Sequence, residues 1–216
     1  MKLINSILRR LSALIAVAPL CTLAQGFCTV TTDDQLVIIE FPSDSRLEFT
    51  IQRPSETDAD VLLCIPAAFI TPEGGVQGAY AIGGQQHGRY NRHSKVSIDG
   101  RTFSLASTIT TGNGFQQMCL VRNHQPVHFR DERRRIRRAL CKENERSPAF
   151  IVESQQPLTM NEFAQMLSKR VAYAVYTDVG SHGYGWYRAA SSPSYLSAMY
   201  FYKKGKQNNW LVCRRT

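Results

Sequence analysis

The stretch "LTMNEFAQMLSKRVAYAVYTDVG", residues 158–180, joins a helix signal directly to a strand signal. Thr159 followed by Glu162 forms a capping box, in which each side chain satisfies a backbone amide at the start of a helix. The apolar stripe of this helix is Phe163, Met166 and Leu167. From Val171 onward the chain is apolar on both faces, which predicts a buried strand. The stretch therefore predicts one helix that leads into one central strand.

Short apolar or alternating runs on both sides of this stretch predict further strands. Their residues are 35–41, 46–52, 60–70, 95–105, 115–127, 134–142, 149–154 and 197–214. Residues 60–70, "DVLLCIPAAFI", are apolar on both faces and predict a central strand. The pair Asp99-Gly100 predicts a hairpin turn, and residues 197–214 predict a terminal hairpin. Together, the strands and the helix predict a single α+β domain with a mixed, mostly antiparallel sheet and few helices.

The first 24 residues have the three parts of a secretory signal peptide. The positive region is Lys2, Arg9 and Arg10, the apolar region is residues 11–20, and the cleavage site is residues 22–24. A helix over residues 11–24 would be about 21 Å long, shorter than the roughly 30 Å hydrocarbon core of a bilayer, so we expect no membrane span. The sequence therefore predicts a signal peptide over 1–24, one domain over 25–216, and a periplasmic or secreted protein.

Cleavage after residue 24 would remove three of the nine net positive charges and leave five cysteines. These are Cys28, Cys64, Cys119, Cys141 and Cys213. Four of them lie in apolar segments, which predicts buried thiols, although an exported chain also permits one internal disulfide. No cysteine or histidine pair has the spacing of a zinc site, and the glycines form no nucleotide-binding pattern. We therefore expect neither a metal nor a cofactor.

The stretch "YTDVGSHGYGWYR", residues 176–188, has the composition of a ligand site at the end of a strand. Asp178 falls at the strand edge where open sheets place ligands, and His182 is a second candidate for proton transfer. The glycines allow close approach, the aromatic rings can stack on a sugar, and the arginine can hold a phosphate. The substrate-binding candidates are Gly180, Ser181, Tyr184, Trp186 and Arg188. The alternative is structural: an aspartate that caps a turn, followed by one more core strand.

The order of elements from residue 60 to residue 188 resembles that of the phosphodiester glycosidase family, which includes N-acetylglucosamine-1-phosphodiester α-N-acetylglucosaminidases. The segments that take the places of family motifs are "CIPAAFI" (64–70), "RRALC" (137–141), "FIVES" (150–154) and "YTDVGS" (176–181). Within them, Arg137 stands at the family arginine, Glu153 near the acidic residue and Asp178 at the aspartate. Gly180 matches the second glycine of the last motif.

The sequence departs from the family pattern at two motifs. The family has an asparagine and two glycines where this chain has Pro66, Ala67 and Ala68. It also has a glycine where this chain has Val179. In the family pattern these glycines suit a tight anion pocket lined by the backbone. Two functions therefore stay open, which are hydrolysis and the binding of a glycan or phosphate without catalysis.

The resemblance implies an exported protein that hydrolyses a sugar linked through a phosphodiester. Arg137 would then grip the phosphate, because a planar guanidinium contacts two oxygens at once. Asp178 would be the acid/base, and Glu153 the second carboxylate. Tyr184 and Trp186 would form the sugar platform. The expected partner is a carbohydrate or sugar phosphate and not nucleic acid, because in a strand the arginines of residues 130–138 would be split between two faces.

Overall fold

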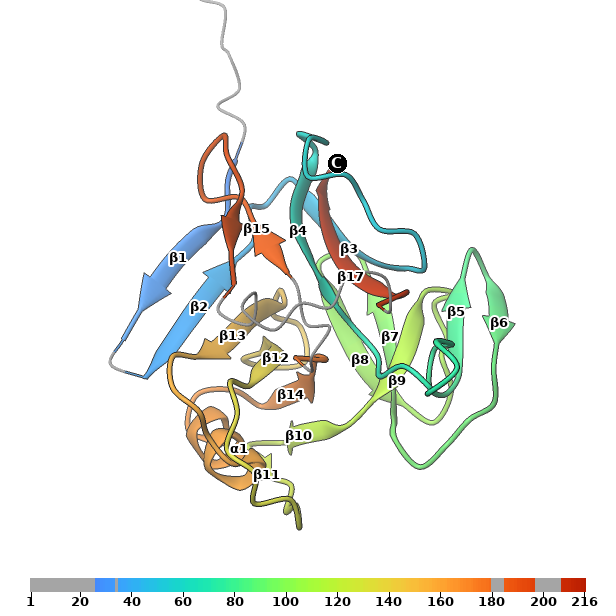
Figure 1. The fold of residues 1–216 in the computed structure, drawn as a ribbon, viewed down its shortest axis with the longest axis vertical. Coiled ribbons are helices and arrows are strands. Elements are labelled where there is room, and N and C mark those ends of the chain that lie inside the picture. Colours follow the sequence, from blue (N-terminus) through green and yellow to red (C-terminus); the bar gives the residue numbers. More distant parts are fainter. Residues whose placement is uncertain (1–25, 34, 180–184, 197–206) are drawn as a thin grey trace, which may run out of the picture.

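The structure, a computed structural model, describes residues 26–33, 35–179, 185–196 and 207–216. These residues form three β-sheets and one α-helix (Figure 1). Every strand pair in the described sheets is antiparallel. The prediction of mostly antiparallel strands is therefore confirmed, but the mixed sheet is wrong, and one short helix makes the chain nearer to all-β than to α+β.

The first sheet has seven strands and is called the large sheet here. Its strands, in spatial order, are β1 (Thr29–Thr32), β2 (Leu36–Glu40), β13 (Phe150–Ser154), β12 (Arg138–Lys142), β14 (Tyr173–Tyr176), β10 (Cys119–Arg122) and β11 (Gln125–Pro126). Strands β12 and β13, which follow each other in the sequence, pair antiparallel. The strand after the helix, β14, lies inside the sheet between β12 and β10, as its apolar sequence requires.

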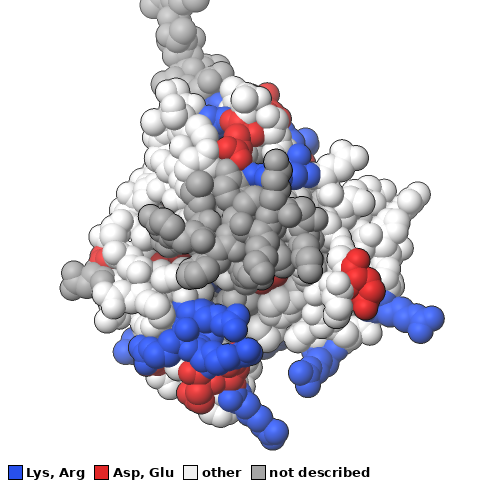
Figure 2. All heavy atoms as spheres, in the orientation of Figure 1, with Lys and Arg blue, Asp and Glu red and all other residues white. Residues whose placement is uncertain are grey.

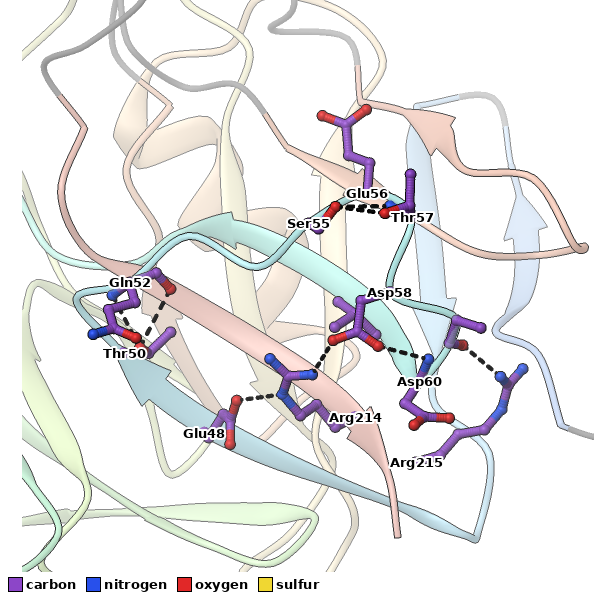
Figure 3. A network of polar contacts seen from close by, with 12 residues as sticks. Glu48, Thr50, Gln52, Ser55, Glu56, Thr57, Asp58, Asp60, Arg214 and Arg215 are labelled. Carbon is purple, nitrogen blue, oxygen red and sulfur yellow. Dashed lines mark hydrogen bonds and ion pairs between the residues drawn. The ribbon is translucent and has the colours of Figure 1, made fainter.

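The second sheet is called the β4 sheet here. Its strands, in spatial order, are β16 (Ser194–Tyr195), β15 (Trp186–Tyr187), β4 (Val61–Pro66), β17 (Trp210–Arg215) and β3 (Ser45–Thr50). Strand β4 is buried at all six positions and lies in the middle, so the prediction of a central strand is confirmed. Figure 3 shows Arg214 of β17 between two carboxylates. It donates hydrogen bonds of 2.7 Å to Glu48 of β3 and to Asp58 in the loop before β4, and so ties this loop to the sheet.

The third sheet is called the β7 sheet here. Its strands, in spatial order, are β6 (Gln85–His87), β5 (Tyr80–Ile82), β9 (Gly114–Gln117), β7 (Ser94–Asp99) and β8 (Thr102–Ala106). The predicted hairpin joins β7 to β8, and Gly100 supplies the positive φ of 54° that its turn needs.

Helix α1 (Met160–Ser168) begins as the sequence predicts. The side chain of Thr159 accepts from the Glu162 amide, and the Glu162 carboxylate accepts from the Thr159 amide. Phe163 and Leu167 of its apolar stripe are fully buried against the large sheet, where they join a core cluster with residues of β10, β12, β13 and β14. The helix thus covers one face of the large sheet at the end where the candidate site residues lie.

One hydrophobic core joins all three sheets. The large sheet contributes Ile39, Leu140, Ile151 and Val175, the β4 sheet Leu47, Phe49, Leu63, Ile65 and Leu211, and the β7 sheet Val96, Ile98, Phe103 and Phe115. Phe49 is at the centre of the aromatic contacts, 5.3 Å from the ring of Phe115 and 5.6 Å from that of Tyr80. Because the sheets share this core, they form one packed body.

The five described cysteines are all buried free thiols, which confirms the prediction of buried thiols and leaves no internal disulfide among them. Burial raises the pKa of Cys28, Cys64 and Cys213 to about 12, so these thiols are protonated at neutral pH. The predicted signal peptide and the first strand of the terminal hairpin lie outside the described residues. Within the described part of the chain, no helix has the length and apolar character needed to cross a bilayer.

Candidate functional site

Four segments that are far apart in the sequence meet at one end of the large sheet. The amide of Asp178, just after β14, donates to the carbonyl of Ala67, just after β4, at 3.2 Å. The amide of Ser154, at the end of β13, donates to the carbonyl of Arg137 at 2.8 Å. These are the segments in which the family resemblance placed its motifs. We call this end of the sheet the strand-end site.

The candidate residues of the strand-end site lie in two rows on opposite faces of the sheet. Arg138 pairs with Glu153 in the ladder, and the Thr177 amide donates to the Arg138 carbonyl at 3.0 Å. The next row contains Ser154, Arg137 and Asp178. Because side chains alternate along a strand, the two rows point to opposite faces. Arg137 and Asp178 are therefore neighbours on one face, and Glu153 is on the other.

Arg137 is buried and most of its guanidinium is used by the fold. Its Nε donates to the Leu158 carbonyl at 3.0 Å, and its Nη2 donates to the Arg133 carbonyl. Its backbone amide donates to the Ser154 hydroxyl at 2.9 Å. Arg137 therefore holds the segments before β12 and before α1 in place, a role that the sequence did not suggest.

Tyr176 is a residue of the site that the sequence analysis missed. The side chain is almost completely buried, and burial is the largest cause that raises the pKa of its phenol. The negative charge of Asp178 raises this pKa further, while Arg137 opposes both effects. The phenol thus lies within reach of both groups and keeps its proton at neutral pH. A tyrosine at the end of a buried strand, two residues before an aspartate, is the signal that could have found it.

Glu153 forms a buried ion pair with Arg138. The carboxylate Oε2 lies 2.6 Å from Nη2 and 2.8 Å from Nε of Arg138, and the two side chains are 1% and 0% exposed. On the same face, Arg138 Nη1 and the Thr177 hydroxyl have no hydrogen-bond partner among the described residues. Glu153 is therefore committed to a cation on the face opposite to Asp178. This position does not favour the predicted role as second carboxylate.

Two buried amides fix the turn after β4. Asn209 accepts from the Ala68 amide at 2.7 Å and donates to the Ala68 carbonyl at 3.1 Å. Gln117 donates to the Ala67 carbonyl at 3.2 Å. Both residues could have been suspected from the sequence, because each is a polar amide beside an apolar run. Since Asn209 occupies the Ala68 amide, this turn does not offer the row of amides that an anion pocket of the family type needs.

Trp186 and Arg188 belong to the interior of the protein. Trp186 is fully buried in a cluster with Val61, Trp210 and other residues of the β4 sheet. The guanidinium of Arg188 lies 5.4 Å from the Trp186 ring. It donates to backbone carbonyls of Val61, Ser191, Glu56 and Asp58. These contacts give both side chains a structural role inside the protein. They do not support the predicted contacts of Trp186 with a sugar and of Arg188 with a phosphate. The other candidates, Gly180, Ser181, His182 and Tyr184, lie outside the described residues.

A patch of exposed arginines borders the strand-end site. Figure 2 shows basic side chains gathered in front of α1, over the segment that leads into β12. The exposed residues of this segment include Arg133, Arg134 and Arg135. Arg133 is paired with Asp131 and Arg134 with Glu162, each at 2.8 Å. The strand predicted over 134–142 is wrong up to Arg137, because β12 begins at Arg138. Arg133, Arg134 and Arg135 are therefore not divided between the two faces of a strand.

Comparison with known proteins gives a fold but no family. The sequence matches no protein-family model and no curated protein. It is similar in structure to a hypothetical protein from Synechocystis, with a TM-score of 0.53 and 12% sequence identity over 87% of this chain. The match spans 61% of the length of that protein. At this identity the likeness shows a shared fold only. Among the described residues, no group of three or more metal-ligating side chains comes together.

Proposed function

We propose that the protein binds a phosphorylated carbohydrate at the strand-end site and does not hydrolyse it by a two-carboxylate mechanism. The observation that carries this proposal is the position of Glu153. Glycosidases of both stereochemical classes use two carboxyl groups that flank the scissile bond. Here Asp178 is on one face of the sheet, and Glu153 is paired with Arg138 on the other. Of the two carboxylates that the family resemblance named, only Asp178 is thus left on the ligand face of this site.

The chemistry of the neighbouring groups supports a phosphorylated sugar as the ligand. A carboxylate such as Asp178 accepts hydrogen bonds from sugar hydroxyls, and the phenol of Tyr176 can donate or accept. A carboxylate repels phosphate, so the phosphate would lie at Arg135 of the arginine patch, which forms no ion pair within the described part of the chain and whose guanidinium can contact two oxygens at once. Arg137 connects the two regions, because it bonds the Arg133 carbonyl and lies beside the Tyr176 phenol.

A second candidate function is hydrolysis of a sugar phosphodiester with Asp178 as the only carboxylate. It is favoured by the closeness of Asp178 to the protonated phenol of Tyr176, since a carboxylate and a phenol can share acid and base roles. In this case Tyr176 would be the proton donor, and Arg137 would be a positioning residue. The family resemblance agrees with this alternative through Asp178 and the order of the elements.

Titration with N-acetylglucosamine 1-phosphate, together with a turnover assay on a chromogenic sugar phosphodiester, tests both candidates. The first candidate predicts binding without turnover, and binding at least about tenfold weaker in Asp178→Asn, since a hydrogen bond to a charged group contributes about 1.5–3 kcal/mol. Arg135→Ala should weaken binding of the phosphorylated sugar but not of N-acetylglucosamine itself. Turnover that is lost in Asp178→Asn and in Tyr176→Phe would support the second candidate.

Asp99→Asn is the matched control, because Asp99 is an exposed aspartate in the turn of the β7–β8 hairpin. The change keeps a residue that suits this turn, so folding and binding should stay as in the unchanged protein. A folded Asp178→Asn protein with unchanged affinity and unchanged turnover would remove Asp178 from the site and end both candidates.

A further inference from the structure

A groove runs between the β7 sheet and the edge of the large sheet, away from Asp178. It has two hollows, of about 650 Å³ and about 460 Å³, and Arg122 at the end of β10 lines both. Volumes of this order are typical of small-molecule sites. Strand β9 of the β7 sheet leads directly into β10 of the large sheet here, so the groove follows the junction of two sheets (Figure 1). We call the two hollows together the basic seam.

The walls of the larger hollow are cationic. Arg92, His93, Arg122 and His128 line it, and its described lining contains no carboxylate. His93 is half-buried, and both burial and the neighbouring Arg92 lower its pKa, so at neutral pH it is an uncharged hydrogen-bonding group. The two arginines therefore give this hollow a positive charge at neutral pH.

Within the described part of the chain, no ion pair involves Arg92 or Arg122. Six arginines elsewhere among these residues are paired with a carboxylate, namely Arg53, Arg133, Arg134, Arg138, Arg170 and Arg214. Two guanidinium groups without an ion pair that line one concave surface raise the local concentration of anions.

The smaller hollow adds groups that suit sugar hydroxyls. Lys142 Nζ lies 4.9 Å from the ring of Tyr173 and donates to the Glu145 carbonyl at 2.9 Å. The Tyr173 hydroxyl contacts the side chains of Asn123, at 2.5 Å, and Glu145, at 3.1 Å. Amide, phenol and carboxylate groups exchange hydrogen bonds readily with hydroxyls. The Glu145 carboxylate would repel an anionic group in this hollow, so the unit that lies here would be an uncharged sugar bound through its hydroxyls.

We propose that the basic seam binds an acidic oligosaccharide of at least two sugar units, with Arg122 at the junction between them. One anionic group would lie between Arg92 and Arg122 in the larger hollow. The next sugar would lie in the smaller hollow, against Tyr173 and within reach of Lys142. This site is separate from the strand-end site and does not depend on the function proposed there.

Calorimetric titration with a hyaluronan tetrasaccharide, in which charged and uncharged sugars alternate, tests the basic seam, with an uncharged tetrasaccharide and a single-stranded DNA of equal charge as comparison ligands. The hyaluronan tetrasaccharide should bind, and its affinity should fall as salt is raised. Arg122→Ala should weaken this binding about tenfold, as expected when a charged hydrogen-bond donor is lost, and Arg92→Ala should weaken it as well. Arg122→Lys should keep more of the affinity than Arg122→Ala.

The matched control is Arg46→Ala, because Arg46 is an exposed arginine on β3, in the β4 sheet. It should leave the affinity unchanged, and so should Asp178→Asn, which separates this proposal from the strand-end site. Thermal melting of each variant checks that it is folded. The proposal is overturned if the hyaluronan tetrasaccharide does not bind, if Arg46→Ala weakens binding as much as Arg122→Ala, if Asp178→Asn abolishes it, or if DNA binds more tightly and depends more on Arg122.

Discussion

Trp186 shows why an aromatic residue in a glycine-rich stretch is ambiguous until its neighbours are known. The sequence surrounds it with Gly185, Tyr187 and Arg188, a mixture that suits a sugar platform. In the structure it pairs with Cys64 of β4 and is fully enclosed. The pattern of the sequence fits both positions, because a two-residue strand is too short for an alternation of apolar and polar residues to be recognised.

Trp186→Ala should lower the free energy of unfolding by about 3–5 kcal/mol, since the change leaves a cavity in the β4 sheet. Trp186→Phe should cost less, because the indole Nε1 that it removes has no hydrogen-bond partner among the described residues. Urea denaturation of both variants measures these effects. Tyr195→Ala on the neighbouring strand is the control, since Tyr195 is 44% exposed. A Trp186→Ala protein of unchanged stability and lower sugar affinity would restore the platform hypothesis.

Three strands of the large sheet meet at one buried ion pair. Glu153 of β13 and Arg138 of β12 are adjacent in the ladder, and Thr177 follows directly after β14. A buried ion pair contributes little net stability compared with apolar residues, but removing one partner leaves a buried charge. The pair therefore makes the structure sensitive to single changes at the end of the sheet.

Glu153→Gln should destabilise the protein by about 3–5 kcal/mol, because Arg138 would lose its counter-charge in a closed interior. The double variant Arg138→Met/Glu153→Leu removes both charges and should recover most of that loss. Chemical denaturation of the single and double variants gives the comparison. If the recovered double variant still binds ligand at the strand-end site, Glu153 is not part of its chemistry. A double variant less stable than Glu153→Gln would contradict the account of the pair.

The loop before β4 is held in place by a hydrogen bond from Arg214 to Asp58 (Figure 3). The hydrogen bond from Arg214 is the main cause that lowers the pKa of Asp58 below its usual value of 3.8. A carboxyl with a lowered pKa in the folded state stabilises above its unfolded pKa, and this stabilisation is lost as the pH falls through the folded value. The contribution of Asp58 should therefore be complete at neutral pH and should begin to fall below about pH 4.

Asp58→Asn should lower the free energy of unfolding at pH 6.5 by less than about 1 kcal/mol, because the Asp58 side chain is 37% exposed and solvent screens the pair. At pH 3 the difference between the two proteins should be smaller. Urea denaturation at both pH values checks this, with Asp60→Asn, a change at an exposed neighbour, as the control. An equal difference at both pH values would show that the ion pair is not its cause.

Strand positions could be predicted from the sequence better than strand partners. The capping box placed α1, and Asp99-Gly100 placed the β7–β8 hairpin, because these signals depend only on nearby residues. Strands β2 and β3 follow each other closely yet lie in different sheets, which alternation along a single strand cannot reveal. The same limit applies to the strand-end site. Arg137 and Asp178 could be found from their motifs, but Tyr176 and Asn209 join them only through the strand pairing.

At the scale of the whole molecule, the junctions between sheets carry both proposed sites. The strand-end site forms where the large sheet meets the end of β4, and the basic seam forms where the large sheet meets the β7 sheet. Phe69 lies between them, with its ring 5.8 Å from that of Tyr176 and 6.0 Å from that of His93. Because one core supports all three sheets, both sites depend on the same packing.

This shared core predicts that the protein unfolds in one cooperative transition. Phe49 of β3 is 1% exposed and packs against Phe115 and Tyr80 of the β7 sheet, so Phe49→Ala should lower the free energy of unfolding by about 3–5 kcal/mol.

The fluorescence of Trp186 and Trp210 reports on the β4 sheet, and far-ultraviolet circular dichroism reports on all three sheets. In urea, the two signals should change together in the unchanged protein and, at a lower urea concentration, in the variant. Ile51→Ala is the control, since Ile51 is 48% exposed and should cost little. If the tryptophan signal shifts alone in Phe49→Ala, the β4 sheet unfolds separately and the sheets do not share one cooperative core.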